Sequence, residues 1–442
     1  MIRFLKISLI LFLLISLTNI ASSMNSSTYL IANAAITSFD YETAAEYFYN
    51  DNSSDFIIIE QRKKIISFIN SNRLEDAKSI ANLAIKLNDN TEEVWLVLLT
   101  FAKLNNDLQI INNFEMLRNK EDFKIIEYVF YKNGQFQTNN EVIAERFFNL
   151  VQQTDSTNLY FPENIDYYLF YLNLALNFKP QFNEVLFIQA QVYQELKYYF
   201  KAEEIYNKIS AQHILYVEAQ KNIIINMKNT KKFHEAEKLL IKLIDIYPND
   251  NSLLILLADL YRTDKQYDKA IGFYTSLIKK QSINDNLLWQ IYYRRGICYE
   301  RSNKWKKAEN DFLKALKIEP EQPQVLNYLA YGWIEKNFYL EKSIKMLETA
   351  IKKNPKSHYF LDSLAWAHFK KNNLSKAVKI MEQAIGIAPG EAISLDHLGD
   401  IYFSLGRTRE AYFMWIQALD LAEPEDNISE SVQIKLDKYN AG

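Results

Sequence analysis

The residues that come closest to a chemical site are Asp396, His397 and Asp400, which stand together in a segment with helical periodicity. An imidazole beside two carboxylates has the donor types that hold a metal ion or move a proton. On a helix, Asp396 and Asp400 are one turn apart and share a face. A metal site made of these three side chains would lack a fourth ligand and the partners that orient ligands. The spacing therefore predicts an acidic patch in a binding surface.

Other chemical motifs are weaker or absent from the sequence. The stretch "HEAEK" at 234–238 begins like a zinc-protease helix, but Lys238 stands where that motif needs a second histidine. No G-x-G-x-x-G, G-x-x-x-x-G-K-[ST] or G-x-S-x-G occurs. Cys298 is the only cysteine, which excludes an intramolecular disulfide and favours a small buried side chain. We therefore expect no enzymatic activity, no cofactor and no metal.

The segment around the acidic patch repeats one that lies 34 residues earlier. "LDHLGDIYFSLGRTREAYFMWIQAL" at 395–419 aligns without a gap with "LDSLAWAHFKKNNLSKAVKIMEQAI" at 361–385. The apolar positions recur, whereas Trp366 stands at the position of Asp400 and a serine at that of the histidine. A pattern that keeps its apolar frame and changes its polar groups indicates a structural repeat.

A ladder of small residues runs through the C-terminal half of the chain at steps of 34, 34, 38, 35, 34 and 34 residues. Its members are Ala202, Ala236, Ala270, Ala308, Ser343, Ala377 and Ala411. A bulky apolar residue follows each one four positions later and a further apolar residue seven positions later, which marks one face of a helix. Each such helix follows another with a central Gly or Ala, as in 254–261 and 395–402. Six of the eight prolines come just after a second helix.

This pattern resembles the tetratricopeptide repeats, in which paired helices recur every 34 residues with Gly, Tyr, Ala, Phe, Ala and Pro at fixed places. The best copies are 287–320, 357–389 and 391–424. The copy at 323–355 departs, with Tyr331 at the Gly position, Ser343 at the first Ala and one extra residue. The resemblance implies an all-α, right-handed superhelical solenoid of antiparallel helix pairs. The last two copies resemble, more narrowly, exported proteobacterial members of this family.

The strength of the repeat divides the sequence into four segments. These are a signal peptide or N-terminal membrane anchor at 1–23, divergent helical repeats at 24–179, a regular solenoid at 180–424, and a capping helix and tail at 425–442. Between residues 88 and 180 the phase is lost, and "TDSTNLYFPEN" at 154–164 predicts an irregular loop. In the tail, Val432, Leu436 and Tyr439 have helical spacing and predict a helix that covers the last face of the solenoid.

The first 23 residues have the composition of an export signal. Arg3 and Lys6 precede an apolar run at 7–17, and small residues follow at 21–23. No further Lys or Arg occurs before Arg62, an asymmetry that directs the following chain across a membrane. We expect an exported protein, either periplasmic after cleavage or anchored to the inner membrane and facing the periplasm. The alternative is a buried first helix of a cytosolic protein.

The partner class follows from the charge and from the resemblance. Basic and acidic residues, 51 and 54, are interspersed, and the net charge of −3 with no basic stripe predicts no nucleic-acid partner. The resemblance implies a concave groove, lined by the first helix of each pair, that binds a protein or peptide. The candidate groove residues are Tyr293, Tyr328, Asp362, Trp366, Asp396 and Asp400. We expect Trp366 to be exposed because its counterparts are small or polar, although groove positions also pack between neighbouring helices.

The expected function is that of a scaffold or adaptor in cell-envelope assembly or client delivery. One alternative is a protein that binds an envelope glycan through the groove tyrosines. The other is a hydrolase or transferase with a site in the irregular region at 88–180. That region contains no histidine and no visible nucleophile–base pair.

Overall fold

The computed structural model describes residues 26–49, 58–118, 123–153, 162–280, 284–424 and 426–440. The predicted signal or anchor at 1–23 lies outside these described residues. Within them, no helix combines the length and the apolar character needed to cross a membrane. The chain divides into two compact units, Met1–Thr230 and Lys231–Gly442, and each is described by itself. The predicted boundary at 179/180 concerns the regularity of the repeats and stays a prediction.

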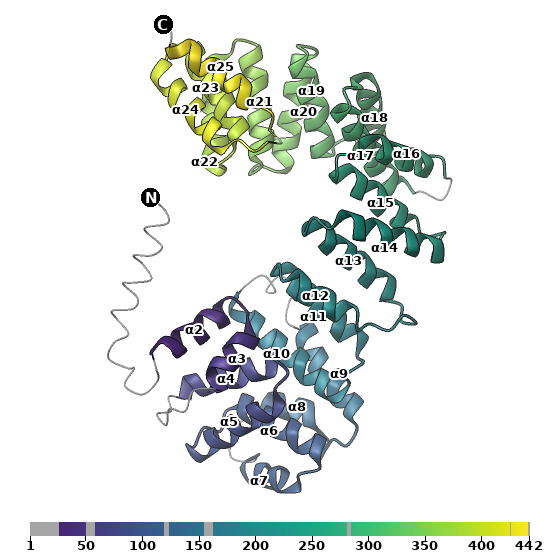
Figure 1. Cartoon of the computed structure of the whole chain (residues 1–442), viewed down its shortest axis with the longest axis vertical. Helices are drawn as coiled ribbons and strands as arrows, with labels where there is room; N and C mark the ends of the chain where they lie inside the picture. Colours follow the sequence, from purple (N-terminus) through teal and green to yellow (C-terminus); the bar gives the residue numbers. More distant parts are fainter. Residues whose placement is uncertain are drawn as a thin grey trace. The chain divides into compact units, whose positions relative to one another are not determined.

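The described part of the N-terminal unit is helical apart from one short hairpin (Figure 1). Its helices are α2 (Ser26–Thr37), α3 (Tyr41–Tyr49), α4 (Ile58–Asn70), α5 (Leu74–Lys86), α6 (Glu92–Asn105), α7 (Leu108–Arg118), α8 (Lys124–Phe130), α9 (Asn140–Gln153), α10 (Pro162–Phe178), α11 (Asn183–Glu195), α12 (Tyr199–Tyr206) and α13 (Tyr216–Asn229). The strands β1 (Tyr131–Lys132) and β2 (Gln135–Phe136) pair antiparallel. Asn133 and Gly134 join them with positive φ angles of 52° and 76°, which suit a two-residue hairpin turn.

The region in which the repeat loses its phase is filled mainly by helices α6 to α10. Helix α10 begins at Pro162, so residues 162–164 of the predicted loop are helical, because proline is tolerated in a first turn. Residues 154–161 lie outside the described part. Helix α10 packs against α4, α9 and α11. Its Asn173 donates a hydrogen bond to Asn70 of α4 at 3.2 Å and accepts one from Gln189 of α11 at 2.9 Å.

The C-terminal unit is a succession of antiparallel helix pairs (Figure 1). Its helices are α14 (Phe233–Ile246), α15 (Asn251–Thr263), α16 (Tyr267–Ile278), α17 (Asp285–Arg301), α18 (Trp305–Ile318), α19 (Pro323–Glu335), α20 (Leu340–Lys353), α21 (His358–Lys370), α22 (Leu374–Ile387), α23 (Ala392–Ser404), α24 (Thr408–Leu421) and α25 (Ser429–Asn440). We call α15, α17, α19, α21 and α23 the helices A, and the helix that follows each one its helix B. The all-α solenoid of antiparallel pairs is confirmed.

The small-residue ladder forms the core between the helices of each pair. Its members on the helices B of this unit, Ala270, Ala308, Ser343, Ala377 and Ala411, are fully buried. A Cβ atom added to Gly399 of α23 would lie 2.4 Å from the indole nitrogen of Trp415 on α24. The helices of this pair therefore approach closely at the central glycine, as the sequence predicts. Cys298 is also fully buried, and burial raises the pKa of its thiol to about 12.

A residue with positive φ ends the first helix of most pairs. These residues are Lys197, Lys231, Lys265, Asn303, Asn337, Asn372 and Gly406. At Gly406 the backbone N–H groups of residues 406 and 407 return to the carbonyl groups of residues 403 and 402, which closes the helix end. In the copy at 323–355, the extra residue lies in this turn, where Phe338 and Tyr339 are 56% and 64% exposed. The helices on either side keep their register.

Candidate partner-binding surface

The six predicted groove residues lie on helices A of the C-terminal unit, and each contacts a neighbouring helix. Tyr293 of α17 and Tyr328 of α19 meet edge to face, with ring centroids 5.5 Å apart and an interplanar angle of 79°. Both rings are half-buried. The structure thus brings these two residues together, as a link between consecutive helices A.

Trp366 is buried, so the prediction that it is exposed is wrong. Only 7% of its surface is accessible. Its indole stacks on the His397 ring, with centroids 4.0 Å apart and an angle of 14°. The indole N–H donates a hydrogen bond to Glu335 of α19 at 2.6 Å. The large ring fills the space between three helices A and satisfies its polar N–H there, which removes it from solvent.

His397 pairs with Asp362 inside the same layer. Its Nδ1 lies 3.0 Å from the Asp362 carboxylate, and the two side chains are 9% and 10% exposed. Burial by itself lowers the pKa of His397, but the Asp362 carboxylate, its hydrogen bond and the carboxylates of Asp396 and Asp400 together raise that pKa above its usual value. The His397–Asp362 contact links α21 to α23.

The carboxylates of Asp396 and Asp400 are paired with a lysine from the last helix. Lys435 of α25 places its Nζ 2.6 Å from Asp396 and 2.8 Å from Asp400. The Trp415 indole N–H also donates to Asp400 at 3.1 Å. Asp396 is 7% exposed, and burial raises its pKa above the ordinary value against the opposing effect of Lys435. Lys435 thus supplies the counter-charge that a buried carboxylate requires, and of the two carboxylates only that of Asp400 is partly exposed. The acidic patch as part of a binding groove stays a prediction.

Lys435 was missed by the sequence analysis, although a signal was present. It lies between Val432 and Leu436, which are the buried residues of α25, so it borders the apolar stripe of that helix. Among the described residues, no group of three or more His, Cys, Asp or Glu side chains is arranged to hold a metal ion. The predicted groove residues instead take part in ring contacts, ion pairs and hydrogen bonds between neighbouring helices.

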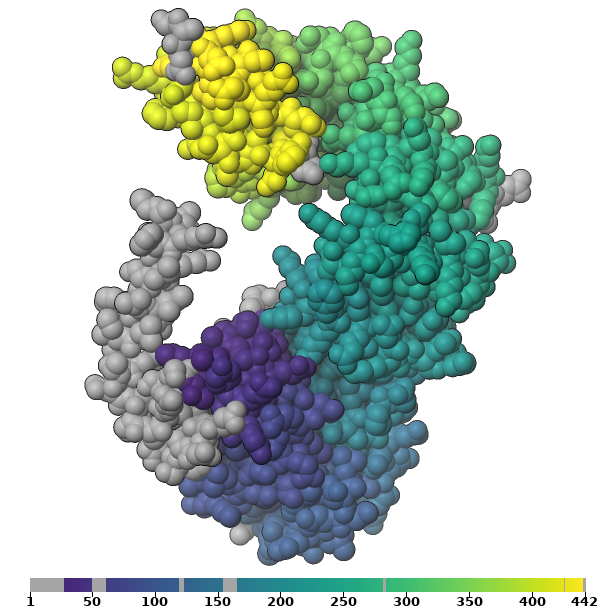
Figure 2. Space-filling model, in the orientation of Figure 1, coloured from purple at the N-terminus to yellow at the C-terminus, as the bar shows by residue number. Residues whose placement is uncertain are grey.

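A cleft of about 680 Å³ opens where α23, α24 and α25 meet. Its lining residues are Asp400, Phe403, Thr408, Trp415, Lys435, Lys438 and Tyr439. Phe403 is 51% exposed, whereas Trp415 is only 3% exposed. Lys438 is exposed. Figure 2 shows the yellow residues of α24 and α25 on the viewed face of this unit. Aromatic walls with a few charged groups can receive an apolar side chain and orient the polar chain next to it.

The fold and this surface define an all-α helical-repeat protein. Models of the tetratricopeptide repeat match residues 252–282, 289–322 and 340–392. The first two segments correspond to the pairs α15–α16 and α17–α18. The chain therefore contains tetratricopeptide repeats, as the resemblance in the sequence indicated, and such repeats generally act as protein-interaction scaffolds.

Solved structures are similar in fold at low sequence identity. Yeast Tom70 is 13% identical, with 94% of this chain and 96% of that chain covered and a TM-score of 0.44. A chain of the APC/C hetero-tetramer Cut9–Hcn1 is 12% identical, with coverages of 96% and 97% and a TM-score of 0.47. YrrB, described as a TPR protein with an unusual peptide-binding site, is 20% identical, with coverages of 45% and 98% and a TM-score of 0.34. A search of curated proteins found no match.

Proposed function

We propose that this chain is an exported scaffold or adaptor that binds a protein or peptide partner on the surface of its helices A. The cleft between α23, α24 and α25 is the observation that carries this proposal. It combines the half-exposed ring of Phe403 with the exposed ammonium group of Lys438 and the carboxylate of Asp400. An extended peptide with one apolar side chain beside a charged group matches this lining.

The predicted groove residues take two roles in this proposal. Tyr293, Tyr328 and Asp400 are half-buried, so part of each side chain is available to a partner. The other three, Asp362, Trp366 and Asp396, are buried, and they position the helices that carry the contact residues.

Export and the role in the cell envelope belong to the same proposal. They are supported by the composition of residues 1–23, with Arg3 and Lys6 ahead of an apolar run. In this account the chain is periplasmic or tethered to the inner membrane through residues 1–23, and it assembles or delivers an envelope client. Determination of the N-terminal sequence of the mature protein, isolated from separated cell fractions, tests this part. A full-length chain in the cytosolic fraction would reject it.

Co-purification with the full chain tests partner binding. Phe403→Ala should reduce partner recovery about 10- to 150-fold, because a buried Phe contact contributes about 1.5–3 kcal/mol. Phe413→Ala is the matched control, since Phe413 lies on α24, is 60% exposed and does not line the cleft. Equal recovery from both variants, at unchanged helicity, would remove the cleft from the binding surface.

A further inference from the structure

Five ionisable side chains join α21, α23 and α25 into one chain of contacts. Asp362 of α21 lies 3.0 Å from Nδ1 of His397 on α23. On the same helix, Asp396 comes directly before His397, and Asp400 follows three residues after it. Both of these carboxylates bind the ammonium group of Lys435 on α25. Since Asp400 and Lys435 line the cleft, His397 is connected to the cleft through charged groups.

His397 lies where a positive charge has strong partners. Its ring stacks on the Trp366 indole with centroids 4.0 Å apart, and the face of an indole attracts a cation. Within the described residues, no lysine or arginine pairs with Asp362, so an imidazolium is its available counter-charge. Burial by itself lowers the pKa of His397, but the three carboxylates around it outweigh burial and raise that pKa.

The remaining titratable groups on the surrounding helices contact other residues or are exposed. Helices α21, α22 and α24 pack against α23, and α19 packs against α21. The groups on these helices and on α25 are Glu335, His358, His368, Lys370, Lys376, Lys379, Glu382, Arg409, Glu410, Asp420, Glu430, Asp437 and Lys438. In the described part of the chain, the charge on His397 therefore acts mainly on Asp362, Asp396 and Asp400.

Helix α25 is held in place by few contacts. Its 12 residues include two buried apolar side chains, Val432 and Leu436. Tyr439 stacks on Tyr412 of α24, with ring centroids 4.8 Å apart. The ion pairs of Lys435 complete this set, so a change in their strength alters the attachment of the whole helix.

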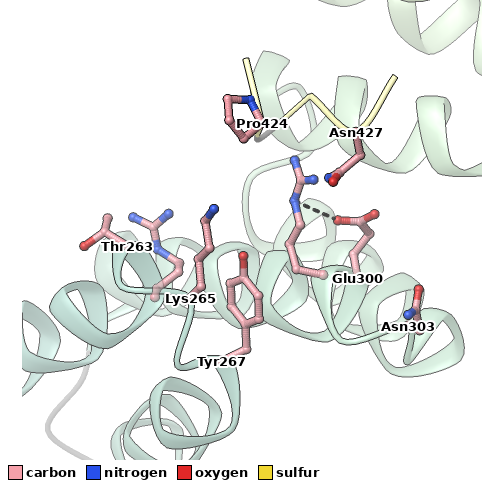
Figure 3. Close-up of a pocket in the computed structure, with 9 residues that line it drawn as sticks. Thr263, Lys265, Tyr267, Glu300, Asn303, Pro424 and Asn427 are labelled. Atoms are coloured by element: carbon pink, nitrogen blue, oxygen red, sulfur yellow. Dashed lines mark ion pairs between the residues drawn. The ribbon is translucent and has the colours of Figure 1, made fainter. Parts of the chain in front are cut away.

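The linker that precedes α25 is held at a different place. Ile428 packs against the apolar core of the last two helix pairs. Figure 3 shows Pro424 and Asn427 of the linker facing the ends of α15 and α17, where they line a pocket. When α25 leaves its position, these contacts keep it close to the cleft.

His397 and Lys435 share the same two carboxylates. A positive charge on His397 reduces the attraction that Asp396 and Asp400 exert on Lys435, because like charges oppose each other at a shared site. Protonation of His397 therefore weakens the attachment of α25. Its effect on the rest of the unit has the opposite sign, since the imidazolium pairs with Asp362 and strengthens the contact between α21 and α23.

We propose that protonation of His397 loosens α25, which forms one wall of the cleft, and so weakens partner binding there in acid. The inference rests on the proposed function in so far as the cleft binds a partner, whereas the coupling between His397 and α25 needs no partner. Such coupling is reciprocal. Docking of α25 through Lys435 therefore reduces the affinity of His397 for its proton.

An NMR titration of the full chain with isotope-labelled histidine measures this affinity, and His397→Gln identifies the resonance. Lys435→Met should raise the proton affinity of His397 about 5- to 10-fold, at the low end for coupled sites because Lys435 is partly exposed. Lys379→Met removes the same charge from an exposed position on α22 and should leave the affinity unchanged. Equal affinities in the unaltered chain and in Lys435→Met would overturn the inference.

Hydrogen exchange, corrected for the intrinsic rate at each pH, measures the response of α25. Protection of residues 429–440 should fall about 5- to 10-fold as the pH falls through the folded pKa of His397, which is raised above 6.5. In His397→Gln this change should be absent. Asp362→Asn keeps the histidine and should shift the change to lower pH. Protection of α25 that is constant, or that rises in acid, would contradict the proposal.

Partner recovery separates this inference from the proposed function. If the protection of α25 is constant while recovery depends on Phe403, only the coupling to His397 is rejected. If protection falls in acid and no partner is recovered at any pH, the scaffold role is rejected and the coupling stands. Recovery that depends on Phe403 but is equal above and below the His397 titration would reject pH control of the cleft.

Discussion

Replacement of Lys435 by methionine tests how α25 is held. Its ammonium group is 2.6 Å from Asp396 and 2.8 Å from Asp400, and the Lys435 side chain is 25% exposed. Removal of one partner from a buried ion pair costs about 3–5 kcal/mol, so we expect about 2–3 kcal/mol for this partly exposed site. α25 also buries Val432 and Leu436, each worth about 1.5–3 kcal/mol, and stacks Tyr439 on Tyr412. The lysine is therefore a major part of the docking free energy.

Hydrogen exchange of the full chain, read by mass spectrometry, measures this loss directly. A cost of 2–3 kcal/mol should accelerate exchange in residues 429–440 about 30- to 150-fold, without a comparable change in α17 or α18. Adding Asp396→Asn and Asp400→Asn removes the unpaired carboxylates and should recover much of the protection. Exchange in α25 that stays within about twofold of the unaltered chain would refute the reasoning.

Three further outcomes are expected. Asp311→Ala should destabilise the C-terminal unit by about 3–5 kcal/mol in urea denaturation, because it leaves the buried Arg295 without its carboxylate partner. Two Arg295 nitrogens lie 2.7 and 2.8 Å from that carboxylate. The double variant Arg295→Met/Asp311→Leu should recover most of the lost stability. Gly399→Ala should lower the free energy of unfolding by about 1–3 kcal/mol, because the added Cβ would lie 2.4 Å from the Trp415 indole. Gly386→Ala, where an added Cβ has no neighbour within 4 Å, should raise that free energy by up to about 1 kcal/mol. The folded-state pKa of His397 is raised above 6.5, so its stabilisation is complete below that pH and is lost as pH rises through the folded pKa. The urea midpoint should fall as the pH rises above about 6.5, and it should fall less in His397→Gln.

The repeat frame could be predicted from the sequence because its physical cause is local and periodic. A small residue must stand wherever two helices cross closely, and Ala270, Ala308 and Ala377 are fully buried as that requirement demands. The periodicity also identified the face on which Tyr293 and Tyr328 meet. Periodicity gives the face of a helix but not what covers it, which is why the exposure of Trp366 was predicted wrongly.

The remaining features depend on contacts outside the repeat. Lys435 reaches Asp396 from a helix beyond the last full pair. Its spacing places it beside the apolar stripe of α25 but does not identify the carboxylate with which it pairs. The hairpin at Asn133–Gly134 did have a local signal, because an Asn-Gly pair favours a two-residue hairpin turn. The sequence analysis considered helices alone and did not use this signal.

A photo-crosslinking side chain at Phe403, in the full chain and in intact cells, tests most directly whether the C-terminal helices A bind a partner. The same substitution at Phe413, which is 60% exposed on α24 and lies outside the cleft, is its reference. We expect one dominant protein adduct at residue 403 that is missing at residue 413. Identical adducts at both positions, or none at residue 403 while a partner still co-purifies, would contradict this expectation.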